Sequence, residues 1–110
     1  MTNIIVKLTY AGLHCWKDCP LEEVKYLKDL HRHTFYIKCK KEVNHDDRDI
    51  EIIMFKDLIL KYLDTKYKGN FGTMSCEMIA RDLMDEFELN YCMVLEDNEN
   101  GAEINLYNIV

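Results

Sequence analysis

The chain has 110 residues and a formal net charge of −6 at pH 7. This length allows one hydrophobic core and no more, so we expect a single domain over residues 1–110. The acidic balance argues against nucleic acid as the main ligand, because phosphate binding needs a basic surface. No apolar run reaches membrane-spanning length and no leader peptide is recognisable, so we expect a cytoplasmic protein, not bound to a membrane, whose five cysteines stay reduced.

Two long strands are expected in the first half of the chain. Apolar side chains recur at every second position in residues 3–12, and many of them are branched, which is typical of a strand. If this strand continues past Gly12, His14 lies on its apolar face. Residues 15–29 contain the only proline and predict a connecting loop with a helical turn. Residues 31–43 alternate again and predict a second strand with one buried and one solvated face.

Two helices follow these strands. After a polar turn and a short extended segment that ends at residue 54, an apolar stripe with helical spacing predicts a helix over residues 55–66. A second helix is expected to begin near Ser75, a good N-cap residue, and to end at Asn90.

The last part of the chain predicts a second hairpin. Residues 91–96 and 103–110 read as strands, and Asn100 with Gly101 offers the positive φ angles of a tight turn between them. The order strand, strand, helix, helix, strand, strand predicts an α+β fold. We expect a four-stranded antiparallel sheet with both helices packed on one face.

Three histidines form the most informative constellation. His31 and His33 are two residues apart on a predicted strand, so their rings project to the same side. His14 can join them if the first two strands are neighbours, and three imidazoles suit a zinc ion with one open position. A histidine pair on an apolar face is also common as ordinary core packing. A mixed site that includes Cys15 or Cys19 is an alternative.

The layout and these residues resemble the family of 6-pyruvoyl-tetrahydropterin synthase and 6-carboxytetrahydropterin synthase, which has the tunnelling fold. Residues 8–14 (LTYAGLH) match a strand that ends in a ligand histidine, and residues 30–35 (LHRHTF) match its His-x-His motif. Residues 75–80 (SCEMIA) match the opening of its second helix, and residues 94–96 (VLE) match a strand that ends in a glutamate.

The resemblance implies a zinc cofactor and a small ligand. His14, His31 and His33 correspond to the zinc ligands, and Glu96 corresponds to the glutamate that anchors a pterin ring. Such a carboxylate can accept two adjacent N–H groups of a pterin or guanine-like ligand. Glu77 is a second candidate for ligand binding, although it also suits a helix N-terminus. The resemblance further implies a homo-oligomer, a trimer or a dimer of trimers.

The acid–base groups of the family are not all present. Leu27 stands where the family has a cysteine or glutamate base, and Thr65 stands where it has a histidine. Asp64, the partner of that histidine, remains as a candidate catalytic residue. Arg32 replaces the glycine between the two histidines of the motif, and Cys19 is one candidate for a substitute base.

Three functions are therefore open. The first is an active zinc-dependent lyase on dihydroneopterin triphosphate, in pterin or deazaguanine (queuosine) synthesis. The second, which Leu27 and Thr65 favour, is a binding protein that holds a pterin or purine-like ligand without turnover and could sequester a nucleotide. The third is a protein-inhibiting or structural factor, and the compact chain fits a phage-borne protein.

Overall fold

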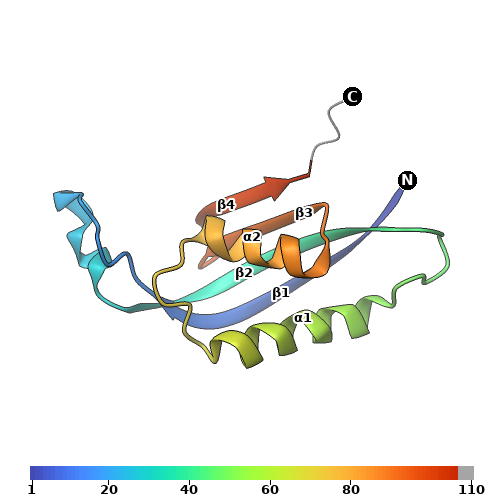
Figure 1. The fold of residues 1–110 in the computed structure, drawn as a ribbon, viewed down its shortest axis with the longest axis horizontal. Helices are drawn as coiled ribbons and strands as arrows, with labels where there is room; N and C mark the ends of the chain where they lie inside the picture. The colour runs from blue at the N-terminus through green and yellow to red at the C-terminus, as the bar shows by residue number, and fades with distance from the viewer. Residues whose placement is uncertain (107–110) are drawn as a thin grey trace.

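The computed structural model describes residues 1–106. The four strands are β1 (Thr2–His14), β2 (His31–Val43), β3 (Tyr91–Glu96) and β4 (Asn100–Asn105). They form one sheet in the order β1-β2-β3-β4, with every neighbouring pair antiparallel (Figure 1). The predicted α+β class and four-stranded antiparallel sheet are confirmed. Within the described residues, no helix is long and apolar enough to cross a membrane.

Helix α1 (Ile52–Tyr67) begins earlier than the sequence predicted. The expected extended segment up to residue 54 is wrong, because the Glu51 side chain caps the helix and accepts hydrogen bonds from the backbone N–H groups of Ile53 and Met54. The branched residues of this first turn resemble a strand only in composition. Their side chains are exposed, so no buried partner competes with the helix.

Helix α2 (Cys76–Phe87) starts after Ser75, as predicted, and the Ser75 hydroxyl accepts a hydrogen bond from the N–H of Met78. It ends before the predicted Asn90, because Glu88 adopts a left-handed conformation that closes the helix. The segment between β1 and β2 contains a short 3₁₀ helix, η1 (Glu22–Lys28). The predicted helical turn in this loop is therefore present.

One hydrophobic core joins the sheet to both helices. Alternate residues of β1, β2 and β3 cluster with the apolar stripe of α1 and that of α2. In Figure 1, α1 lies along β1, and α2 lies near the β3–β4 hairpin. The largest fully buried side chains are Phe35, Ile37, Ile59, Leu63, Ile79, Leu83, Leu89 and Val94.

The two helices are also tied together by a polar cluster around Asp82 on α2. Its carboxylate accepts hydrogen bonds from the hydroxyls of Tyr62 and Tyr67 and from the ammonium group of Lys66, all on α1. Burial alone would raise the pKa of Asp82, but these three donors outweigh it and hold the pKa below its usual value. We call these four residues the Asp82 cluster.

The loop between α1 and α2 docks against the end of β1. The N–H of Leu13 donates to the carbonyl of Gly69, and the N–H of Phe71 donates to the carbonyl of Leu13. Gly12 permits this approach, because a Cβ atom there would lie 2.9 Å from the Phe71 ring. The loop is thereby fixed beside His14, at one end of the sheet.

The second hairpin differs from its prediction. Its turn lies at Asp97 and Asn98, which both have positive φ angles of 54° and 60°. Asn100 and Gly101 belong to β4, where they pair with Glu96 and Leu95, so the predicted Asn-Gly turn is wrong. Aspartate and asparagine tolerate positive φ better than other non-glycine residues. β4 accordingly begins earlier than predicted, and positions 107–110 of that predicted strand lie outside the described residues.

Candidate metal centre and adjoining pocket

The three predicted histidines meet at one end of the sheet. His14 is the register partner of His31, and Gly12 is the partner of His33, so all three rings share the core-facing side. Their ring centroids lie 4.6 to 5.3 Å apart. One ring nitrogen from each histidine lies within 4.8 Å of the other two. The long β1–β2 ladder therefore produces the convergence that the sequence pattern predicted.

Hydrogen bonds fix the orientation of each ring. The Nδ1 atom of His14 is 2.9 Å from the carbonyl oxygen of Met74, and that of His31 is 2.9 Å from the carbonyl oxygen of Asp29. A carbonyl oxygen only accepts, so each of these Nδ1 atoms carries the hydrogen. The Nδ1 atom of His33 donates to the Asp97 carboxylate at 2.7 Å. In the neutral imidazoles, the three lone pairs are consequently on Nε2.

The Nε2 atoms of His14 and His31 are buried and have no hydrogen-bond partner. Buried polar atoms in proteins are nearly always satisfied, so an orphaned pair beside a third histidine calls for a ligand. Metal-ligating histidines commonly donate their other ring N–H to a carbonyl or a carboxylate, which is the pattern here. The donor set of neutral imidazoles suits zinc, copper, iron or nickel.

Asp97 is a residue of this site that sequence reasoning missed. It sits in the hairpin turn, where one carboxylate oxygen binds His33 and the other accepts the backbone N–H of Thr34 at 3.0 Å. The hydrogen bond from His33, followed by that from Thr34, holds the pKa of Asp97 below its usual value. No local motif signals this role, since 64 positions separate Asp97 from His33 along the chain.

Glu96 reaches the same cluster from β3. It is the register partner of Phe35, and it continues the inward-facing series of Cys92 and Val94. One carboxylate oxygen, Oε2, lies 2.9 Å from the Nε2 atom of His14, and the other, Oε1, lies 3.6 Å from that of His33. The predicted ligand-binding glutamate is therefore in direct contact with the histidines.

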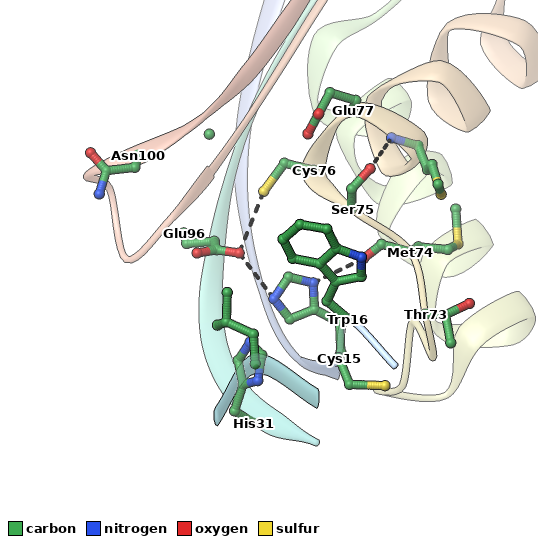
Figure 2. Close-up of a pocket in the computed structure, with 14 residues that line it drawn as sticks. Cys15, Trp16, His31, Thr73, Met74, Ser75, Cys76, Glu77, Glu96 and Asn100 are labelled. Atoms are coloured by element: carbon green, nitrogen blue, oxygen red, sulfur yellow. Dashed lines mark hydrogen bonds and ion pairs between the residues drawn. The ribbon is translucent and has the colours of Figure 1, made fainter. Parts of the chain in front are cut away.

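A pocket of about 400 Å³ opens beside the cluster (Figure 2). Its polar end holds His14, His31 and Glu96, and the start of α2 contributes Glu77 and Cys76. Its walls are largely apolar and include the side chains of Trp16, Leu27, Met74 and Met78. A largely apolar pocket with a few convergent polar groups is the usual form of a small-molecule site.

Cys76 lies against Glu96 at this polar end, with Sγ 3.8 Å from Oε2 (Figure 2). Burial, and then the charges of Glu96 and Glu77, raise the pKa of the Cys76 thiol to about 12. The thiol is therefore protonated at neutral pH and is a poor nucleophile. All five cysteines of the chain are free.

Two further candidates lie apart from the histidines. Asp64 is on α1 beside Tyr10, and it is not among the residues that line the pocket. Cys19 is buried in the loop after β1, where its Sγ points toward the carbonyls of Leu21 and Val24. Cys15 lines the pocket but is not one of the three residues whose ligand atoms converge.

Comparisons of the chain with protein-family models and with curated proteins find no match.

Proposed function

We propose that this chain binds a zinc ion through His14, His31 and His33, and that the adjoining pocket holds a pterin or guanine-like ligand without converting it. The observation that carries the proposal is the convergence of three histidines whose Nδ1 atoms are all engaged as donors. Such an arrangement presents three Nε2 lone pairs to one point. Zinc fits three imidazole nitrogens and, in sites of this kind, keeps a fourth position free.

The pocket supports a flat ligand that is rich in hydrogen-bond donors. Glu96 and Glu77 supply carboxylates, and a carboxylate can accept two parallel N–H groups such as those of a pterin or guanine ring. Trp16 lines the pocket with an aromatic face. The element order and the antiparallel sheet support the proposal that this chain has the tunnelling fold of the tetrahydropterin synthases. In that fold both helices pack on one face of the sheet.

Leu27 is the reason to propose binding rather than turnover. Leu27 lines the pocket. By the sequence resemblance it stands where the family has its proton-transferring base, and a leucine cannot move a proton. Thr65 is exposed on α1, and Asp64 lies outside the pocket. A bound zinc ion would polarise hydroxyl groups of the ligand and lower their pKa. With Leu27 at the position of the family's base, no matching group is present at that position to take up the released proton.

The test combines elemental analysis with calorimetry. We expect one zinc ion per chain after reconstitution, and much less in His31→Ala. His45→Ala is the matched control, because His45 lies in a distant loop near Asp49. Calorimetry with pterins and guanine nucleotides should then give saturable binding to the zinc-loaded protein.

Three results would contradict parts of this function. Absence of zinc binding would overturn the whole proposal. Zinc binding without any ligand would leave a structural or protein-inhibiting role. Conversion of dihydroneopterin triphosphate would replace the binding role by that of an active lyase.

We further propose that the chain assembles as a homo-oligomer, a trimer or a dimer of trimers. Strands β1 and β4 are the two edges of the sheet, and an uncovered edge can pair with a strand of another copy. Mass measurement in solution tests this directly, and a monomer at micromolar concentration would contradict it.

A further inference from the structure

The contact between Glu96 and His14 places two hydrogen-bond acceptors face to face. The Nδ1 atom of His14 donates to the Met74 carbonyl, so the Nε2 atom of the neutral ring carries a lone pair. An ionised carboxylate is also only an acceptor. The 2.9 Å separation between Nε2 and Oε2 of Glu96 is therefore repulsive unless something positive lies between or beside them.

A shared proton does not explain this contact well. If His14 were an imidazolium ion, Nε2 would donate to Glu96, yet this atom has no partner with hydrogen-bond geometry. His31 Nε2 is orphaned in the same way, and a proton on His14 would do nothing for it. A metal ion placed among the Nε2 atoms satisfies all of them together.

Two distances from Glu96 are close to those between ligands of one ion. Atoms bound to one tetrahedral zinc ion at about 2.0–2.2 Å lie about 3.3–3.6 Å apart. Oε2 of Glu96 lies 2.9 Å from the Nε2 atom of His14, somewhat less than this range, and Oε1 lies 3.6 Å from that of His33, at its upper end. Glu96 thus contacts the Nε2 atoms of two of the three histidines, His14 and His33. Glu96 is not among the three residues whose ligand atoms all lie within 4.8 Å of one another, so a small movement of its side chain toward His31 would complete the site.

We propose that Glu96 is the fourth ligand of the metal while the pocket is empty. The site would then be a closed His₃Glu centre, not a His₃ centre with a free position. This inference rests on the proposed metal binding. Glu96 also lines the pocket, so a ligand with adjacent N–H groups would compete with the metal for the same carboxylate. Filling the pocket would thereby open a coordination position for a second group of the ligand.

The experiment uses the cobalt(II)-substituted protein, because the visible spectrum of cobalt changes with its ligand set and geometry. Glu96→Gln should shift the absorption bands of the wild-type protein and lower zinc affinity about tenfold or more, measured by competition with a chromophoric chelator. Glu99→Gln is the matched control. It removes the same charge from an exposed position in the turn that follows Glu96, between β3 and β4, and should leave both readouts unchanged.

The outcomes separate this inference from the proposed function. A wild-type protein that binds no metal overturns both. A wild-type protein that binds metal, together with an unchanged cobalt spectrum in Glu96→Gln, overturns the role of Glu96 as a ligand even if the affinity falls. A crystal structure of the zinc-loaded wild-type protein serves if the variant does not fold. A Glu96 oxygen within about 2.2 Å of the zinc ion supports the inference, and a water molecule in that position contradicts it.

Discussion

Replacing Asp97 by asparagine tests how firmly the hairpin turn holds His33. Both carboxylate oxygens of Asp97 are in use, one on His33 Nδ1 at 2.7 Å and one on the N–H of Thr34 at 3.0 Å. Asparagine offers one acceptor oxygen and an NH₂ group, so it can keep only one of these two hydrogen bonds. Its NH₂ group would then lie against the remaining N–H donor, which is unfavourable. It also removes the charge that makes the bond to His33 short.

The expected result is weaker metal binding with an intact fold. Loss of a carboxylate that orients a ligand histidine typically lowers metal affinity about 10- to 100-fold, and we expect Asp97→Asn to fall in this range. Zinc affinity is measured by competition with a chromophoric chelator. The measurement is made at pH 7, where wild-type Asp97 is ionised. The ¹⁵N shifts of the imidazole rings provide a second readout, because His33 should lose its fixed tautomer.

Asp46→Asn is the matched control for this measurement. Asp46 is exposed in the turn after β2, where it accepts a hydrogen bond from the Thr2 hydroxyl at 2.6 Å, and it does not line the pocket beside the histidines. The same chemical change there should leave zinc affinity unaltered. If both variants bound zinc as tightly as the wild-type protein, His33 would not need its carboxylate partner and the reasoning would be refuted.

Three further predictions concern the metal-free protein and are measured by urea unfolding in the presence of a chelator. Asp82→Asn should cost about 1.5–3 kcal/mol at pH 7, because charged hydrogen bonds of the Asp82 cluster are lost. The folded-state pKa of Asp82 is lowered, so its contribution is complete above the unfolded pKa of about 3.9, and the difference should shrink as the pH falls below that value. Gly101→Ala should cost roughly 1–3 kcal/mol, since the added Cβ atom would lie 1.9 Å from the Val94 carbonyl oxygen and push β4 away. Ser75→Ala should cost about 1 kcal/mol through the lost N-cap bond to Met78.

Each of these predictions has a result that contradicts it. An Asp82→Asn protein whose deficit stays constant from pH 7 to pH 3 would show that the carboxylate is not preferentially ionised in the folded state. A fully stable Gly101→Ala protein would mean that β3 and β4 lie farther apart than described. Equal stability of Ser75→Ala and the wild-type protein would show that the start of α2 is held by its packing alone.

The strands could be predicted where apolar and polar side chains alternate strongly along the sequence. The limits predicted for β2 and β3 agree with the structure, because each strand places every second residue in the core. The start of α1 was not predictable from the sequence, since its cap is a glutamate and its first turn opens with two β-branched isoleucines. The hairpin turn was misplaced because Asn100 and Gly101 carry a strong turn signal, whereas Gly101 is needed for close approach to β3.

The site was predictable only as far as strand geometry reaches. The alternation of β1 and β2 is enough to place His14, His31 and His33 on one side. The partners of their Nδ1 atoms follow no such pattern. Met74 is 60 positions away from His14, and it reaches the ring only because the loop before α2 docks on β1. Contacts of this kind depend on tertiary packing that a single sequence does not specify.

The direct pairing of His14 with His31 has a consequence for how this protein can change. Side chains on a strand alternate with a period of two, so a single-residue insertion between Val6 and His14 would turn His14 to the opposite side of the sheet. An insertion in the middle of the loop that joins β1 to β2, away from Trp16, Leu27 and Asp29, would leave the strand register as it is. Variants selected for altered metal affinity should therefore accept length changes in that part of the loop and reject odd-numbered ones within either long strand.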